Sequence, residues 1–292
     1  MILIVGASST IGQATIPLLV EAGYKLRLAS REPEKLQKFA GSHVEIVQAD
    51  LRDEASLRRA CEGVDMVFAS AASMCGYGKN ASKHVDYVGH RTLIDIARTS
   101  NVKHFVYMST QEATHDNPEV FFRYKAKTED YLRASGLSYT ILRASAFFVP
   151  YVALIGDAVL KGGKATIMGK GENPRNFIAN DDVARFAVIA LTDPTARNQT
   201  INIGGPNNLT SKQVAEIYAR VAGVELKFRM IPRFVPRVMA TIMKPFYPGL
   251  SDVMAAIIDS DTQAKAFDVS PTLQQYPVTL TKLEDWVQGQ KP

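Results

Sequence analysis

The sequence is poor in cysteine and has no clustered metal ligands. Cys61 and Cys75 are the only cysteines among 292 residues, too few for a disulfide framework and typical of a protein of the reducing cytoplasm. No group of Cys and His residues has the spacing of a metal site, so we expect no bound metal. The five histidines do not pair with Ser and Asp around a nucleophile, which disfavours a hydrolytic triad.

A long apolar run is also lacking. The longest uncharged apolar stretch, residues 144–156, is too short to cross a bilayer. No basic segment leads into an apolar one at the start, so we expect neither a membrane span nor a signal peptide, and a cytoplasmic location. The net charge is +5, but the charges are scattered without a basic run, which gives no support for a nucleic-acid partner.

Short apolar runs alternate with helical patterns through the first half of the chain. Strands are expected at residues 2–5, 25–29, 44–48, 66–69, 104–108 and 138–142, and helices near 11–22, 33–40, 54–61, 83–100 and 119–135. Continuous apolar strands separated by helices predict a parallel sheet covered on both faces. The expected fold class is therefore α/β, with a doubly wound, Rossmann-type sheet whose ligand crevice lies beyond the carboxyl ends of the strands.

A glycine-bearing turn follows the first strand and opens the first helix. Gly6 permits a tight turn, Gly12 lets helix and strand pack closely, and a helix N-terminus attracts a pyrophosphate. Ser9 replaces the central glycine of the usual motif, and its small side chain still allows close backbone approach. The residues expected to bind a dinucleotide here and after the neighbouring strands are Gly6, Ser8, Ser9, Thr10, Ile11, Gly12, Leu51, Ala69, Ser70 and Ala71.

The second strand ends without the acidic residue that would bind a ribose 2′-hydroxyl. Ser30 and Arg31 stand there instead, and a guanidinium with a neighbouring hydroxyl suits a 2′-phosphate. This ending favours NADP(H) over NAD(H), with Lys35 as a possible assistant, and the alternative is that Arg31 merely faces solvent. Asp50, after the third strand, is placed either to meet the adenine amine or to cap the next helix.

The second half of the chain has a more broken pattern. A helix at 181–192, a strand near 200–203 and a capping box that opens a helix at 210–222 are expected, with a second capping box at Thr281–Glu284. We expect an NADP-binding Rossmann core over 1–150 and a small α/β substrate lobe over 151–292, of which about 177–204 return to the core sheet. The segment 232–250, rich in Pro, Met and aromatic residues, is open to three interpretations: a lid, a membrane-surface element or a partner-binding element.

Several motifs together resemble the short-chain dehydrogenase/reductase superfamily, and most closely its atypical NmrA-like branch. They are Gly6–Gly12, Ser30–Arg31, Asp50–Asp53, Val85–Leu93, Phe105–Thr110, Glu129–Arg143 and Phe177–Val183. The resemblance covers about residues 1–230. It implies an NAD(P)H-binding fold and oxidoreductase chemistry.

The resemblance also assigns catalytic positions. Relatives carry Ser or Thr after the fifth strand and Tyr-x-x-x-Lys on the next helix, which places Thr110 and Lys125 at the serine and lysine positions. Phe121 stands at the tyrosine position and cannot donate a proton. Lys125 is then the candidate acid/base and ribose ligand, if burial favours its neutral form, and the alternative is a solvated helix lysine. Thr110 equally well caps the helix or bonds a backbone group.

Methionine and aromatic side chains near the expected crevice provide an adaptable apolar wall. The candidate substrate-pocket residues are Met74, Tyr77, Phe121, Phe147, Phe148 and Tyr151. For each of them taken singly, core packing is the alternative role.

Two functions are consistent with these features. The first is an NADPH-dependent reductase of a small apolar carbonyl, enone or quinone; Phe121 favours quinones, because a hydroquinone oxygen needs only a weak proton donor. The second is a nonenzymatic NADP(H)-binding redox sensor or assembly factor, for which the missing tyrosine is simply explained. A nucleotide-sugar epimerase is disfavoured by Arg31 and Phe121. By analogy with the fold, helices 83–100 and 119–135 are candidates for pairing in a homodimer.

Overall fold

The computed structural model describes residues 1–247, 251, 254–255, 258–259 and 261–290. The chain divides into two units. The first unit comprises Met1–Arg143 and Val183–Asn202, and the second comprises Ala144–Asp182 and the chain from Ile203 onward. Part of the segment 232–250 that the sequence singles out, namely 248–250, lies outside the described residues.

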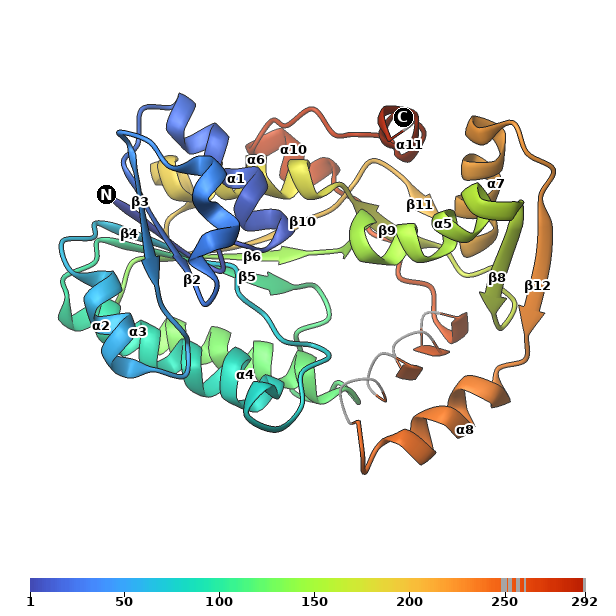
Figure 1. The fold of residues 1–292 in the computed structure, drawn as a ribbon, viewed down its shortest axis with the longest axis horizontal. Coiled ribbons are helices and arrows are strands. Elements are labelled where there is room, and N and C mark those ends of the chain that lie inside the picture. Colours follow the sequence, from blue (N-terminus) through green and yellow to red (C-terminus); the bar gives the residue numbers. More distant parts are fainter. Residues whose placement is uncertain (248–250, 252–253, 256–257, 260, 291–292) are drawn as a thin grey trace. The chain divides into compact units, whose positions relative to one another are not determined.

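A seven-stranded sheet forms the core of the first unit (Figure 1). Its strand order is β10-β6-β5-β4-β1-β2-β3. The strands are β1 (Ile2–Val5), β2 (Leu26–Ser30), β3 (Val44–Gln48), β4 (Met66–Ala69), β5 (His104–Thr110), β6 (Tyr139–Ala144) and β10 (Gln199–Ile203). β1 pairs in parallel with both β2 and β4, so the strand order reverses beside β1. In a doubly wound sheet, ligands bind at such a reversal, and the expected fold class is confirmed.

Helices cover both faces of this sheet (Figure 1). α1 (Thr10–Glu21) and α6 (Asn180–Thr192) lie on one face, and α2 (Glu54–Cys61), α3 (His90–Thr99) and α4 (Val120–Ala134) lie on the other. The helix expected near 33–40 is the 3-10 helix η1 (Pro33–Phe39), and short 3-10 turns lie at η2 (Gly78–Asn80) and η5 (Pro194–Ala196). The helix expected at 83–100 begins with a π-helical segment, η3 (Lys83–Gly89).

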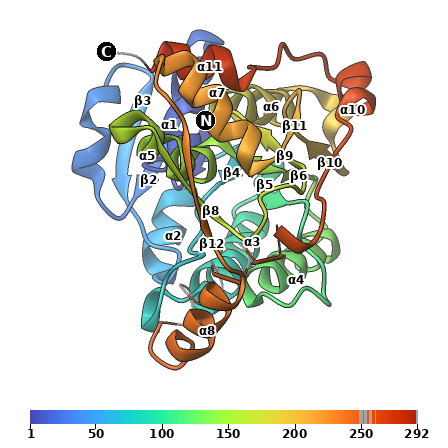
Figure 2. The same cartoon turned by 90° about the vertical axis from the view of Figure 1, so that its right-hand side faces the viewer.

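The second unit holds two small sheets. One has the order β11 (Asn208–Leu209), β9 (Arg175–Ile178), β7 (Ala146–Phe147), and the other pairs β12 (Lys227–Ile231) with β8 (Lys164–Met168). Its helical elements are η4 (Phe148–Val152), α5 (Ala153–Gly162), α7 (Ser211–Ala222), α8 (Phe234–Met243), α10 (Ser270–Gln275) and α11 (Leu283–Gly289). α7 packs against both α5 and α11 around an apolar core, and Figure 2 shows α7 beside α11. Within the described ranges, no helix is both long and apolar enough to span a bilayer.

The two expected capping boxes have different outcomes. Thr210 accepts a hydrogen bond from the Gln213 amide, and Gln213 bonds back to the Thr210 amide, so this capping box is confirmed. The second prediction is wrong, because α11 begins at Leu283 without a side-chain cap. The amide and hydroxyl of Thr281 instead donate to the buried Asp182 carboxylate, at 2.7 and 2.9 Å.

A buried carboxylate fixes α4 on the sheet of the first unit. Glu129 has no exposed surface. It accepts hydrogen bonds from Ser109 on β5, from Arg143 on β6 at 2.9 Å, and from Arg133 on α4 at 2.9 Å. Because a buried charge is costly without partners, these contacts specify how the helix seats on its strands.

Replacing Glu129 with Ala should lower the free energy of unfolding by about 2–3 kcal/mol. This is less than for a fully enclosed ion pair, because Arg133 and Arg143 both reach solvent. Urea denaturation measures the change. Asp130→Ala is the matched control, since Asp130 is the next residue, is exposed and also pairs with Arg133; it should cost less than about 1 kcal/mol. Equal costs would contradict the role given to Glu129.

Candidate functional site

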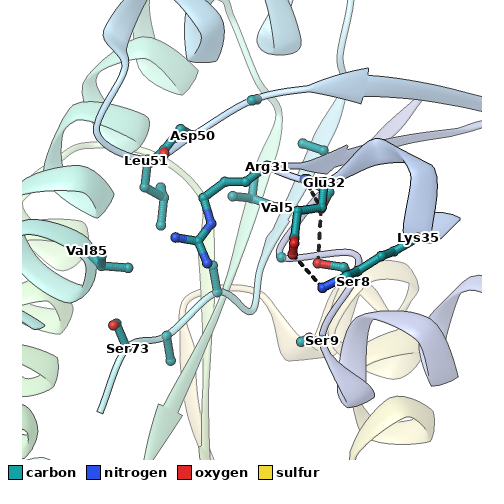
Figure 3. A pocket seen from close by; sticks show the side chains of 16 residues that line it. Val5, Ser8, Ser9, Arg31, Glu32, Lys35, Asp50, Leu51, Ser73 and Val85 are labelled. Carbon is teal, nitrogen blue, oxygen red and sulfur yellow. Dashed lines mark hydrogen bonds and ion pairs between the residues drawn. The ribbon is translucent and has the colours of Figure 1, made fainter. Parts of the chain in front are cut away.

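A pocket of about 310 Å³ opens in the first unit beyond the carboxyl ends of β1, β2 and β3 (Figure 3). Its position matches the point where the strand order reverses. Its wall is formed by Val5, Gly6, Ser8, Ser9, Ala29, Ser30, Arg31, Glu32, Lys35, Ala49, Asp50, Leu51, Ala71, Ala72, Ser73 and Val85.

The turn between β1 and α1 is closed by two glycines. Gly6 has a φ of +90°, and a Cβ there would lie 2.5 Å from the Ala71 nitrogen. A Cβ on Gly12 would lie 2.5 Å from the carbonyl oxygen of Gly6. Glycine at position 12 therefore lets α1 approach the end of β1, and glycine at position 6 lets the turn approach Ala71 after β4.

Ser9 caps α1, and this is the role of the residue that departs from the glycine motif. Its hydroxyl accepts a hydrogen bond from the Gly12 amide at 3.0 Å. The amides of Thr10 and Ile11 donate to no group in the described part of the chain. These two free N–H groups stand at the positive end of the helix dipole, which is an arrangement that binds phosphate.

Arg31 contributes the one pocket-lining cation that makes no ion pair with a described residue. Lys35 is paired with Glu32 at 2.7 Å, and the attraction of Lys35 holds the pKa of Glu32 below its usual value. Arg31 has only a 3.5 Å contact with the side-chain oxygen of Asn80. Its guanidinium points across the pocket, away from the Glu32–Lys35 pair (Figure 3). The positive charge of Arg31 is thus available to an anion.

Ser30 and Asp50 have internal partners at the rim of the pocket. The Ser30 hydroxyl donates to the Ser8 hydroxyl at 3.0 Å and accepts from the Glu32 amide at 3.1 Å, so it holds the two neighbouring loops together. Asp50 accepts from the Arg52 amide at 2.9 Å and from the Arg52 side chain. Hydrogen bonding to Arg52 lowers the pKa of Asp50. The N-cap of α2 is Asp53, not Asp50.

The pocket brings together most of the residues expected to bind the nucleotide. Those that line it are Gly6, Ser8, Ser9, Ser30, Arg31, Asp50, Leu51 and Ala71, whereas Thr10, Ile11, Gly12, Ala69, Ser70 and Lys125 lie outside its wall. Sequence reasoning did not assign seven wall residues to the pocket: Val5, Ala29, Glu32, Ala49, Ala72, Ser73 and Val85. Glu32 adjoins the expected Arg31, and Val85 begins the motif Val85–Leu93, so both could have been found from the sequence. No pattern marks Ser73.

Lys125 is buried, with 3% of its surface exposed, and so it is not a solvated helix lysine. Its ammonium lies 3.3 Å from the Asp86 carboxylate and donates to the Met108 carbonyl at 3.1 Å. The rings of Tyr107 and Phe121 lie 4.8 and 5.6 Å away. A cation in this position is stabilised by the carboxylate, the carbonyl and the ring faces together.

Asp86 is the functional candidate that the sequence did not reveal. It comes from η3 and has no exposed surface. One oxygen faces Lys125, and the other accepts the Ser73 amide at 3.0 Å. Burial raises the pKa of the Asp86 carboxyl, and the charge of Lys125 opposes that shift. Since Ser73 lines the pocket, Asp86 connects the pocket wall with the buried lysine.

His90 and Tyr107 complete this buried polar cluster. Their rings meet edge to face at 5.1 Å. The His90 Nδ1 bonds to the Val85 carbonyl at 2.8 Å, and burial lowers the pKa of His90 to about 3. The ring is therefore neutral at physiological pH. The His90 Nε2 and the Tyr107 hydroxyl are buried and have no hydrogen-bond partner among the described residues.

The remaining expected site residues are distributed over both units. Thr110 is half-buried, and its hydroxyl accepts a hydrogen bond from the Glu112 amide at 3.4 Å, a local backbone contact. In the first unit Tyr77 is 62% exposed and Phe121 is buried, while Met74 is half-buried. In the second unit Phe147 and Tyr151 are half-buried, and Phe148 packs in the core against Trp286. In the described portion of the chain no group of acidic, His or Cys side chains is arranged to hold a metal.

Comparison with known proteins places the chain among nucleotide-binding proteins. Residues 6–194 match the family described as NAD(P)H-binding. The photosystem II assembly factor Ycf39 of Trieres chinensis is 25% identical over 98% of this chain and 91% of that protein. An NAD(P)H azoreductase of Xenophilus azovorans is 28% identical over 89% of this chain and 91% of that protein.

The fold and the cofactor class agree with a solved structure. The NADPH-dependent quinone oxidoreductase QOR2 of Escherichia coli, complexed with NADPH, is similar with a TM-score of 0.80, at 25% identity and 99% coverage of both chains. The glycine turn, the free amides of α1 and the unpaired cation described above fit such a cofactor. The resemblance to atypical short-chain dehydrogenases/reductases is confirmed, and the protein belongs to the NAD(P)H-binding family.

Proposed function

We propose that the protein is an NADPH-dependent reductase of a small apolar carbonyl, enone or quinone. The observation that carries the choice of cofactor is the cation of Arg31, which has no carboxylate partner among the described residues and lies at the end of β2. The adenosine ribose occupies this place in a doubly wound fold. A 2′-phosphate there would form charge-assisted hydrogen bonds with the guanidinium.

The surroundings of Arg31 support the same preference. Ser30 replaces the usual acidic residue and is occupied with Ser8 and Glu32, so no carboxylate at the strand end is placed for a 2′-hydroxyl. Glu32 follows Arg31 in the chain, and its carboxylate is paired with Lys35. Asp50 remains the candidate for the adenine amine. The free amides of Thr10 and Ile11 serve the pyrophosphate.

Lys125 is the proposed proton donor. Bound NADPH supplies a hydride, and the reduced substrate then needs a proton at its oxygen. Phe121 cannot provide one at the position that relatives reserve for tyrosine. The Lys125 ammonium is held by Asp86 and the Met108 carbonyl, which fix its direction and compensate its charge.

Quinones and conjugated carbonyls are the substrates best suited to a site with Lys125 as proton donor and Phe121 in place of tyrosine. A developing hydroquinone or enolate oxygen is stabilised by a weak donor, so loss of the tyrosine hydroxyl is tolerated. Similarity to an azoreductase and to a quinone oxidoreductase supports a conjugated substrate. In the first unit, Met74, Tyr77 and Phe121 remain the proposed apolar contacts, and Thr110 a second polar one. The proposed roles of Phe147, Phe148 and Tyr151 rest on the sequence alone.

The second candidate is a nonenzymatic NADP(H)-binding assembly factor or redox sensor. It is favoured by the similarity to an assembly factor over nearly the whole chain and by Phe121 at the tyrosine position. In this case Asp86 and Lys125 form a structural ion pair. Both candidates share the nucleotide pocket and a cytoplasmic location, so turnover separates them and cofactor binding does not.

The Arg31→Ala variant should lose the preference for NADPH. We expect its Kd for NADPH to rise about 10- to 100-fold, the cost of a charge-assisted contact, with little change for NADH. Isothermal titration of cofactor-free protein with each nucleotide measures both values. The control is Lys38→Ala, which removes an exposed charge from nearby η1 outside the pocket. An equal loss for both nucleotides would contradict the assignment of Arg31 to the 2′-phosphate.

Replacing Lys125 with Met should lower kcat with a panel of quinones and enones by about 100-fold, the usual contribution of a general acid. The Kd for NADPH should change by no more than a few fold. Stopped-flow or steady-state oxidation of NADPH gives kcat, and titration gives Kd. Lys125→Met alone leaves the buried Asp86 carboxylate without an opposite charge. The double variant with Asp86→Asn removes both charges, so it tests the same loss of kcat without an unpaired buried charge.

Lys127→Met is the matched control for this experiment. Lys127 is exposed and lies two residues further along α4, so this variant should keep the wild-type rate. If the folded Lys125 variants turned over at the wild-type rate, Lys125 would not be the proton donor. If no substrate raised NADPH oxidation by the wild-type protein, the assembly-factor or sensor function would replace the reductase.

A further inference from the structure

The chain between Glu225 and Asp252 is basic and apolar. It carries five cations, Lys227, Arg229, Arg233, Arg237 and Lys244, and no acidic residue. Residues Lys227 to Tyr247 of this stretch are all described by the structure. We call them the basic apolar segment. It consists of β12, α8 and the residues that follow α8, which Figures 1 and 2 show in succession beyond the α5–α7 pair of the second unit.

α8 presents an apolar stripe to solvent. Phe234, Val238 and Ile242 are 65%, 50% and 63% exposed. They recur every fourth residue, so at 100° per residue they fall within an arc of about 80° on the helix. The opposite side of the helix carries its one buried residue, Pro236. Amphipathic helices of soluble domains turn their apolar side inward, whereas α8 exposes the large apolar side chains of this stripe.

Further apolar side chains extend this exposed surface on both sides of α8. Phe246 and Tyr247 follow the helix and are 71% and 53% exposed. Phe228 and Met230 precede it on β12, with 42% and 43% of their surfaces exposed. Clustered exposure of large apolar side chains marks an interaction surface, whereas single ones carry no such meaning.

The cations of the segment are largely free. Arg233 is held by Asp261, and Lys227 lies 3.8 Å from Glu225. Arg229, Arg237 and Lys244 form no ion pair with any residue that the structure describes. The helix therefore offers an apolar stripe bordered by unneutralised positive charge.

We propose that the basic apolar segment docks the protein on the surface of a membrane that contains anionic lipids. A helix with bulky apolar residues on one side and Arg or Lys beside them lies in the lipid interface, with its apolar side among the acyl chains. The free cations would meet the anionic headgroups. Phe246 and Tyr247 suit the interface, where aromatic side chains are enriched. α8 has ten residues, so it lies on the bilayer and does not cross it.

Sedimentation with vesicles tests the proposal. The intact protein should pellet with vesicles of equal parts phosphatidylglycerol and phosphatidylcholine, and not with phosphatidylcholine alone. Raising the salt concentration should weaken binding, because headgroup attraction is screened. The variants F234S/I242S and R237E/K244E should each reduce the partition coefficient at least about tenfold.

Two control variants match these changes. Leu154→Ser removes an apolar side chain that is 67% exposed on α5, outside the segment. K25E/K161E alters the net charge as much as R237E/K244E does, at exposed lysines elsewhere in the chain. Both should bind vesicles like the wild type. Thermal melting and NADPH titration show that every variant remains folded, independently of whether the reductase proposal holds.

The outcomes distinguish a membrane from a second copy of the chain as the partner that covers this surface. Loss of vesicle binding in both segment variants, with the controls unchanged, supports the membrane. Absence of binding to anionic vesicles overturns it. Self-association in sedimentation velocity that F234S/I242S abolishes, without vesicle binding, would assign the stripe to a second copy of the chain. Equal loss in the control variants would show attraction by net charge alone and would also overturn the proposal.

Discussion

A side chain at position 12 would bring its Cβ to 2.5 Å from the carbonyl oxygen of Gly6, and the nucleotide pocket depends on the absence of that side chain. Because residue 12 is glycine, α1 starts directly against the end of β1, and the amides of Thr10 and Ile11 have no partner in the described part of the chain. Ser9 replaces the central glycine of the motif, and its hydroxyl caps the helix. The contact thus sets where α1 begins and where its N-terminal amides lie.

The sequence predicts the first unit well, because apolar runs specify buried parallel strands. The runs at 2–5, 44–48 and 66–69 give the observed boundaries of β1, β3 and β4. Arg31 was also within reach, since it ends an apolar strand where an acid is expected. A local sequence pattern does not show which distant residue a side chain will contact in the folded chain, however. Thr281 has the pattern of a helix cap, yet Asp182 provides it with a stronger, buried acceptor.

Asp86 shows why part of the site could not be predicted from the sequence. An aspartate within a helical pattern is normally an exposed residue, and the burial of Asp86 follows from the packing of η3 against α4. Lys125 is its partner from a position 39 residues later. No spacing rule relates residues that two different helices bring together, so only the folded arrangement identifies the pair. The exposed stripe on α8 is similar: its periodicity predicts a helix, but not which side faces solvent.

The Asp86 carboxylate makes two contacts in the first unit: it accepts a hydrogen bond from the Ser73 amide and lies beside the Lys125 ammonium. Ser73 lies in the wall of the nucleotide pocket. If a bound nucleotide displaced the Ser73 backbone, it would also displace the carboxylate that holds the Lys125 ammonium. Asp86 is thus a physical connection between the pocket wall and the buried lysine, whichever of the two proposed functions the protein has.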